Sequence, residues 1–562
     1  MSLSYPQETF NHTKFTPSSF LARRRLTVRK NTLLAQLSIL KSTGRYDAFR
    51  LKWHPAYNQG YKALFWDSDI AKWLEGACYF LAEKGHDDEE DKVIDDAVEG
   101  LTDMIASAQW KDGYLNIHFT VVKPGLRFTN IRDLHELYNA GHLIEAALIH
   151  HQLYGNTLLL DPVLKYVSQI HTTFGPGPEQ IHGYPGHPEI ELALLRLHAR
   201  TGNTHAYDLA KYFITERGNP HGVKGQHFYL SESQQRGEDP GQRPAGDAWP
   251  TANAFWYQQA HKPILEQMTI EGHSVRAMYL LTAVADVVRL SRTVETESNQ
   301  FEGYKSACER LWDNMVNRKM YLTGGIGAIE QWEGFGIDYF LPQSTDEGGC
   351  YAETCASIGV MMLAERMLQL DLNGKYADIM ELELYNTVLG GMSQDGKEFL
   401  YENHLASCEK RPMKRESWFD CACCPPNVTK TFGMLGGYLW SYDVKGKDVE
   451  IDVHLYNSAV LDLLDIAGET CYLKQETDWP WGNSVTFSLV MSPKLDVTIK
   501  LRIPSWAQPF EDGKLFHLTP SPSTNLTISK CYLILKPRVH LCTLRQTNDP
   551  HLQPKSFRSW SP

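Results

Sequence analysis

Apolar residues recur at helical spacing through most of the chain. In the segment 187–202, Ile190, Ala193, Leu194 and Leu197 fall three or four residues apart, which is typical of a helix buried along one side. Gly202 stands at the end of this segment, where a glycine commonly ends a helix. A second helical stretch follows each such stop, so the pattern predicts a series of helix hairpins.

The dipeptide Gly-His precedes an amphipathic stretch at three places and suggests an internal repeat. His187 follows His142 by 45 residues, and His273 follows His187 by 86, about twice that step. Cys355 follows His273 by another 82 residues. This spacing predicts hairpins of about forty-odd residues, within the range of helical repeats. We expect each of the three histidines at the start of a helix.

The number of predicted hairpins is compatible with a closed fold. Pairs are predicted over 69–108 and near residues 142, 187, 273 and 353, and the last helix, 427–440, pairs with an N-terminal helix at 33–41. Six pairs are enough to close an (α/α)6 barrel, so we expect a mainly α fold. An open helical solenoid fits the repeats as well. The polar connection 231–252 is longer than a solenoid needs and is interpreted as a rim loop.

The period changes after Lys445. The segments 449–463, 484–491 and 496–507 alternate apolar and polar residues or run rich in β-branched ones, which indicates strands. We therefore predict a barrel domain over 1–444 and a β-sandwich domain over 445–562. Residues from 512 onward are weakly patterned, and the end, 547–562, is expected to be disordered.

Charge and composition exclude several classes of partner. The 562 residues carry a formal net charge of −12 and no long basic run, whereas nucleic acids and anionic membranes need a clustered cationic face. The first ten residues lack the apolar core of a signal peptide, and no apolar run reaches membrane-spanning length. We expect a cytoplasmic protein without a nucleic-acid or membrane partner. A homodimer is compatible with the sequence.

Cysteines crowd one part of the chain. There are 11 in all, an odd number, and Cys408, Cys421, Cys423 and Cys424 lie close together. In a large chain without a secretory signal, such crowding indicates metal or catalytic chemistry. If the inner helices share one mouth, Glu353 and Cys355 meet Cys423 and Cys424 there.

Three sulfurs and one carboxylate form a ligand set suited to zinc. The set is Glu353, Cys355, Cys423 and Cys424, and thiolates favour Zn²⁺ over magnesium or calcium. Four protein ligands are typical of a closed structural site, because a catalytic zinc usually keeps an open position. The ligand count alone therefore favours a structural zinc that joins two distant helices.

Glu333 favours a catalytic interpretation. It follows the glycine-rich segment 321–327 and stands between Trp332 and Phe335. A carboxylic acid against aromatic rings has its pKa raised by desolvation, as a general acid needs. The alternative is an ordinary surface glutamate in a loop.

Several motifs together resemble glycoside hydrolase family 127, whose characterised members include β-L-arabinofuranosidases. The resemblance covers about Leu33 to Ala507, and its motifs are GGIG, the Trp-Glu loop, YAETCASIG, ELYNTVLGGM, WFDCACCPPN, HELYNAGH, GHPEIELAL and GHSVRAMY. It implies an (α/α)6 barrel followed by β-sandwich domains. Two departures stand out: an insertion, TDEGGC, at 345–350, and a C-terminus that is shorter than the family's.

The resemblance also implies roles for particular residues. It makes Cys423 the nucleophile, Glu333 the general acid/base, and Glu353, Cys355, Cys423 and Cys424 the zinc ligands. It assigns the holding of the sugar to His142, His187, His273, Tyr385 and Gln36. The expected activity is a retaining release of β-L-arabinofuranose or a similar furanose from a small carbohydrate substrate. Alternatives are another sugar-active barrel enzyme, such as an epimerase or lyase, and a non-catalytic sugar-binding protein with a structural zinc.

Overall fold

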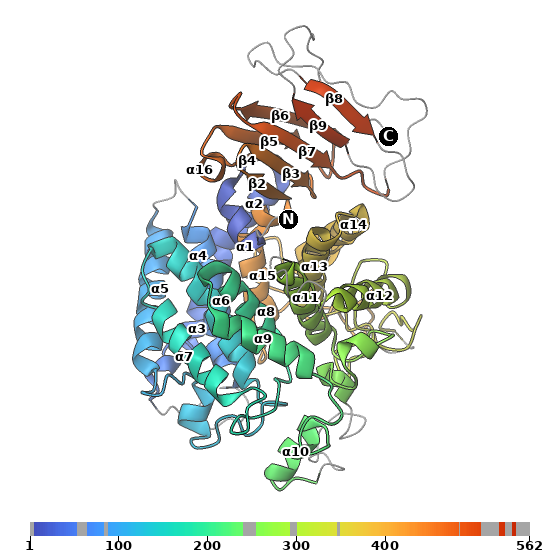
Figure 1. Ribbon diagram of the computed structural model, residues 1–562. Coiled ribbons are helices and arrows are strands. Elements are labelled where there is room, and N and C mark those ends of the chain that lie inside the picture. The colour runs from blue at the N-terminus through green and yellow to red at the C-terminus, as the bar shows by residue number, and fades with distance from the viewer. Residues whose placement is uncertain are drawn as a thin grey trace. The chain divides into compact units, whose positions relative to one another are not determined.

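The computed structural model describes the chain as two compact units (Figure 1). One comprises Lys30–Arg366 and Leu382–Lys430, and the other Met1–Arg29, Met367–Glu381 and Thr431–Pro562. The residues described are 5–52, 64–83, 88–239, 255–292, 301–345, 349–482 and 484–506, together with the backbone of 528–533 and 542–546. The domain boundary after residue 444 stays a prediction.

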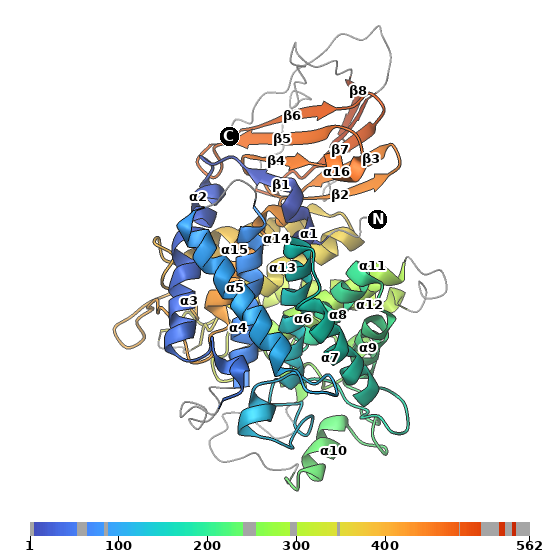
Figure 2. The same ribbon diagram turned by 90° about the vertical axis from the view of Figure 1, so that its left-hand side faces the viewer.

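Helices in pairs dominate the larger unit (Figure 2). The inner helices are α4 (Trp66–Leu81), α6 (Glu136–Tyr154), α8 (Glu189–Thr201), α11 (Ser274–Ser291), α13 (Thr354–Leu370) and α15 (Cys424–Gly433). The helices that flank or follow them in this unit are α3 (Leu33–Ser42), α5 (Glu89–Ala108), α7 (Leu160–Thr173), α9 (Thr204–Glu216) and α12 (Glu302–Arg318). Helix α14 (Gly374–Glu383) follows α13 and belongs mostly to the smaller unit. The shorter α10 spans Phe228–Gln235.

The inner helices form a closed ring. Helix α4 packs on α6, α6 on α8, and α8 on α11, while α5, α7, α9 and α12 each pack on the inner helix before them. Glycines allow two further close approaches: Gly359 of α13 lies against Met278 of α11, and Gly76 of α4 lies against Thr429 of α15. Cys355 of α13 and Cys424 of α15 complete the ring, with their sulfurs 3.3 Å apart. Every residue of α11 is buried, as expected for a helix enclosed on all sides. The predicted (α/α)6 barrel is confirmed.

The smaller unit holds two sheets. Their strands are β1 (Thr13–Phe15), β2 (Trp440–Lys445), β3 (Asp448–Val453), β4 (Ala459–Asp462), β5 (Cys471–Thr477), β6 (Val485–Met491), β7 (Asp496–Leu501), β8 (Ile528–Leu533) and β9 (Cys542–Gln546). The orders are β1-β4-β5-β6 and β2-β3-β7-β9-β8, with only the β3–β7 pair parallel among the described strands. Short helices α1 (Pro6–Thr9), α2 (Phe20–Thr27) and α16 (Leu464–Ala467) accompany them.

The β region confirms the predicted change of period, with differences at its edges. Buried residues alternate along β3, β5 and β7, because successive side chains of a strand face opposite sides. Strand β2 begins at Trp440, within the helix that the sequence predicted over 427–440. The predicted disordered end, 547–562, lies outside the described residues.

Two other local predictions were wrong or incomplete. Gly141-His142 does not open a helix, because α6 already begins at Glu136. Gly141 is needed inside the helix: a Cβ there would lie 2.7 Å from the Glu189 side chain and 2.9 Å from the Ile190 backbone of α8. The predicted rim loop 231–252 begins inside α10, and its residues 240–252 lie outside the described part.

Candidate active site

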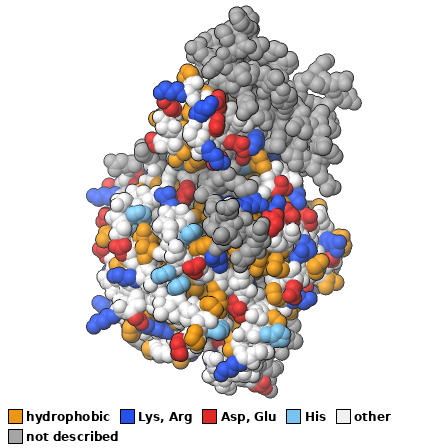
Figure 3. Space-filling model, viewed as in Figure 1, with side chains coloured by type: hydrophobic (Ala, Val, Ile, Leu, Met, Phe, Trp, Pro, Cys, Tyr) orange, Lys and Arg blue, Asp and Glu red, His pale blue; other side chains and the backbone are white. Residues whose placement is uncertain are grey.

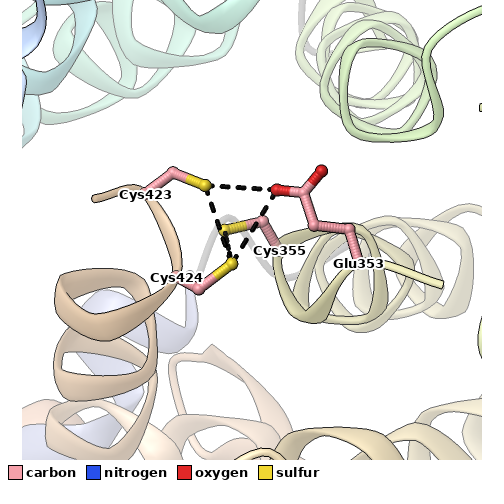
Figure 4. A group of neighbouring side chains, drawn as sticks. All are labelled: Glu353, Cys355, Cys423 and Cys424. Carbon is pink, nitrogen blue, oxygen red and sulfur yellow. Dashed lines mark hydrogen bonds between the residues drawn. The ribbon is translucent and has the colours of Figure 1, made fainter. Parts of the chain in front are cut away.

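The four side chains of the predicted zinc ligand set converge at the beginnings of α13 and α15 (Figure 4). Glu353 immediately precedes α13, and Cys355 lies in its first turn. Cys424 begins α15, and Cys423 precedes it. One ligand atom from each of the four lies within 4.8 Å of the others. The sequence therefore identified a group that the fold brings together from segments about seventy residues apart.

Glu353, Cys355, Cys423 and Cys424 are called the thiol cluster below. The distances between their ligand atoms suit a tetrahedrally coordinated ion. The Cys423 Sγ lies 3.2 Å from Glu353 Oε1 and 3.6 Å from Cys424 Sγ. The Cys355 and Cys424 sulfurs are 3.3 Å apart, and Cys424 Sγ lies 3.9 Å from Glu353 Oε1. A tetrahedron with zinc bonds of about 2.0–2.3 Å has edges of roughly 3.3–3.8 Å. The donors and their spacing thus fit Zn²⁺.

The electrostatics of the thiol cluster also fit a cation. Burial raises the pKa of Glu353 well above its usual range, and the neighbouring Cys423 and Glu333 raise it further. Burial likewise raises the pKa of the Cys424 thiol. For Cys355, burial acts to raise the pKa, but hydrogen bonds with Cys423 and Cys424 outweigh it and lower the value to about 6. Four crowded acidic groups repel when ionised, and a divalent cation removes that penalty.

Glu333 lies in a loop held against the start of α11. Its backbone carbonyl accepts hydrogen bonds from the Ser274 N–H, at 3.1 Å, and from the Ser274 hydroxyl, at 2.9 Å. Its φ of 53° is in the left-handed region, an uncommon conformation for a residue with a side chain. Glu333, His273 and Glu353 each offer a polar atom within 4.8 Å of the others. Glu353 therefore connects the thiol cluster with Glu333.

The expected raised pKa of Glu333 was wrong. Burial does act to raise it, but hydrogen bonds from His273 and Tyr351 outweigh burial, and the pKa is lowered from its usual value. The His273 Nε2 lies 2.8 Å from Oε2, and the Tyr351 hydroxyl donates to Oε1 at 3.0 Å. The Trp332 indole instead donates to the Phe335 carbonyl. The two donors, rather than the aromatic neighbours, set the charge of this carboxyl group.

The three repeated histidines lie along one chain of aromatic rings. His142 contacts Tyr138 at a centroid distance of 4.6 Å, Tyr138 contacts His187 at 4.5 Å, and His187 lies 6.3 Å from His273. His187 stands just before α8, and His273 is the N-cap of α11. His142 lies deeper, within α6, where its Nδ1 is 3.0 Å from a Glu189 carboxylate oxygen. The repeat thus brings the histidines together although only two stand at helix starts.

The two remaining candidates for holding the sugar lie on α3 and in a π-helical turn. Gln36 of α3 is buried, and its side-chain oxygen accepts a hydrogen bond from Thr429 of α15 at 3.1 Å. Tyr385 is half-buried in a π-helical turn, Leu384–Val388. Their roles in holding a sugar stay predictions.

Two neighbours of the site were not predicted from the sequence. The Tyr401 hydroxyl lies 3.2 Å from the Cys423 sulfur, and the Asn427 amide donates to the Cys355 sulfur at 3.1 Å. Asn427 is part of the CCPPN motif, so its place one turn into α15 was a usable signal. Tyr401 follows a loop and carried no such signal. Cys408 belongs instead to a separate hairpin with Arg411.

Gly334 gives the Glu333 loop its position. A Cβ at this residue would lie only 1.8 Å from the Gly272 carbonyl oxygen. Gly334→Ala must push the loop away from α11, and we expect about a 10²-fold loss of kcat/KM, since a shift near 1 Å at a reacting group has effects of that size. Steady-state kinetics with unchanged metal content will check this. Gly336→Ala, in the same loop, is the matched control, and equal losses in both would contradict the placement.

On the face shown in Figure 3, basic and acidic side chains of the described residues are interspersed. No helix in the described ranges is both long enough and apolar enough to cross a membrane. Cellular location, oligomeric state and the absence of nucleic-acid partners stay predictions.

Comparisons with known proteins agree with this geometry. The profile of the β-L-arabinofuranosidase GH127 catalytic domain matches residues 13–437, and that of the GH127 middle domain matches 450–532. The match thus runs past Ala507, where the resemblance was expected to end. A non-reducing end β-L-arabinofuranosidase from Bifidobacterium longum subsp. longum is 36% identical over 462 residues, which are 79% of this chain and 65% of that protein. The chain therefore spans slightly less than two thirds of this relative.

Solved structures show the same architecture. A GH127 β-L-arabinofuranosidase from Geobacillus stearothermophilus T6 superposes with a TM-score of 0.79 at 34% identity, covering 97% of this chain and 81% of that one. A second GH127 β-arabinofuranosidase gives a TM-score of 0.74 at 31% identity, covering 96% and 80%.

The fold and the site define a class of protein. It is a helical barrel in which three cysteines and one glutamate, a group that could bind a metal ion, lie where two of the inner helices begin. The chain belongs to glycoside hydrolase family 127.

Proposed function

We propose that this protein is a retaining glycosidase that releases β-L-arabinofuranose, with Cys423 as the nucleophile and Glu333 as the acid/base. The observation that carries the proposal is the thiol cluster, in which Cys423 lies 3.2 Å from a carboxylate that also neighbours Glu333. A nucleophile and a separate proton carrier at one site are what the two-step mechanism requires. The β-L-arabinofuranosidase activity of the relatives supports the choice of sugar.

The first step forms a bond to sulfur. The Cys423 thiolate attacks the anomeric carbon, the bond from that carbon to the leaving oxygen breaks, and Glu333 gives its proton to that oxygen. In the second step Glu333 takes a proton from water, the water oxygen bonds to the anomeric carbon, and the carbon–sulfur bond breaks. Two inversions at this carbon retain its configuration. The lowered pKa of Glu333 favours the carboxylate form, which the second step uses.

Glu353, Cys355, Cys423 and Cys424 would hold the zinc ion. A bound zinc would keep the Cys423 sulfur deprotonated at neutral pH and ease its departure as thiolate. His142, His187, Tyr385 and Gln36 are the proposed sugar-holding residues; His273, to which the resemblance assigns the same role, instead contacts Glu333. His142 is fully buried beside Glu189.

Metal content tests the proposal. We expect about one zinc per chain, because the described residues supply one four-ligand group of this type. Prolonged chelation should abolish hydrolysis of a nitrophenyl β-L-arabinofuranoside, and added Zn²⁺ should restore it. Elemental analysis and activity are measured on the same samples, and NMR follows which anomer is released first. Full activity in metal-free protein, or release with inverted configuration, would show that the proposed mechanism is wrong.

A further inference from the structure

His273 stands between a helix terminus and the proposed acid/base. As the N-cap of α11, its Nδ1 accepts a hydrogen bond from the Val275 backbone N–H at 3.1 Å. Its Nε2 lies 2.8 Å from Glu333 Oε2. The ring is buried, and each of its two nitrogens makes one of these contacts.

The helix cap fixes which nitrogen carries the proton. A nitrogen that accepts an N–H bond has no hydrogen of its own, so a neutral ring with Nδ1 as acceptor is protonated at Nε2. That hydrogen points to the Glu333 carboxylate. A doubly protonated ring would lose the cap and place a positive charge at the positive end of the α11 dipole. The start of α11 therefore keeps His273 as a neutral donor.

Glu333 is held on both of its oxygens. Oε2 faces His273, and Oε1 accepts the Tyr351 hydroxyl. Its backbone is fixed by Ser274, the first residue of the same helix. The helix that sets the His273 tautomer therefore also sets the position of the residue that His273 contacts.

We propose that His273 is a positioning residue for Glu333, with its Nε2–H fixing the carboxylate and its Nδ1 fixed in turn by the α11 N-terminus. This differs from the sugar-holding role implied by the family resemblance. It rests on the proposed function, because the contact matters to catalysis only if Glu333 is the acid/base.

Two substitutions distinguish the helix-capping contact of Nδ1 from the Glu333 contact of Nε2. His273→Asn keeps an oxygen where Nδ1 caps the helix but is too short to reach Glu333. His273→Gln places an N–H near the Nε2 position but is a poor cap. We expect His273→Asn to lose about 10- to 100-fold in kcat on substrates with poor leaving groups, the size of one hydrogen bond to a charged group, and much less on glycosylation by a nitrophenyl substrate. His273→Gln should keep most activity although its Tm is lower.

Two other outcomes would contradict the proposed role of His273. If His273 were merely structural, activity would follow Tm, and His273→Gln would be the weaker enzyme. If it held the sugar, His273→Asn would raise KM by a similar factor for good and poor leaving groups. Either result overturns the proposal and leaves the assigned acid/base in place.

A double-mutant cycle gives the most direct test. Residues that act through one group are non-additive. Adding His273→Asn to Glu333→Gln should therefore cost less than about threefold in kcat on a poor leaving group, since less remains for His273 to position. If the activity losses of the two single substitutions multiply in the double variant, the proposal is wrong. If Glu333→Gln alone shows no leaving-group dependence, the acid/base assignment fails, and the role of His273 falls with it.

Discussion

Cys423→Ser is expected to lower kcat/KM at least about 10⁴-fold on every arabinofuranoside, whatever the leaving group. A serine hydroxyl is a weak nucleophile at its ordinary pKa and a poor zinc ligand. The Cys423 sulfur is in contact with Glu353 Oε1 and Cys424 Sγ, so the substitution should also weaken metal binding. Activity on a nitrophenyl substrate and zinc content are measured together, with zinc added in excess.

Cys408→Ser is the matched control, because it changes a thiol that lies in a separate hairpin with Arg411 and is not among the four grouped ligands. It should stay within a few-fold of the unmodified protein. Cys424→Ser, which removes a ligand but leaves the Cys423 thiol, should recover partial activity in excess zinc. If Cys423→Ser and Cys424→Ser are equally restored by zinc, the metal is structural and Cys423 is not the nucleophile.

Glu333→Gln is expected to lose about 10²- to 10⁴-fold in kcat on substrates with poor leaving groups, the usual range for general acid–base catalysis. The first step should lose far less with a nitrophenyl leaving group, which needs little protonation. Azide needs no base to react as a nucleophile, so it should speed turnover of the nitrophenyl substrate. Kinetics across leaving groups of graded pKa, with and without azide, check these expectations.

Glu330→Gln serves as the control in the same loop. Its carboxylate is exposed and pairs with Arg411, so removing it should change activity little, as is usual for surface ion pairs. Equal rates of Glu333→Gln and the unmodified protein on every substrate would rule out Glu333 as the acid/base.

Features set by neighbouring residues could be predicted from the sequence. The hairpins around His187, His273 and Cys355 followed from apolar spacing, and Gly202 marked the end of the helix after His187; both are local signals. Their repetition made a closed ring predictable, and with it the meeting of Cys355 with Cys423 and Cys424. The site could be anticipated because equivalent helix starts converge in a barrel of hairpins.

Features set by distant contacts could not be predicted. Gly141 looked like a helix start, but its role is to let α8 approach α6 within the barrel. The pKa of Glu333 depends on the hydrogen bonds that His273 and Tyr351 donate to its carboxylate. The adjacent tryptophan suggested desolvation, but its indole N–H donates to the Phe335 carbonyl. Strand β1 spans only Thr13–Phe15 and pairs with β4, more than four hundred residues later. Spacing along the chain carries no record of such pairings.

The covalent intermediate is the most direct test of the account. Glu333→Gln is incubated with a nitrophenyl β-L-arabinofuranoside, quenched in acid, digested and examined by mass spectrometry. The account predicts one pentosyl unit on the peptide that contains Cys423, attached to that residue, because no base remains to activate water. Release of nitrophenol beyond one equivalent with no modified peptide, or a pentosyl unit on Glu353 or another residue, would contradict it.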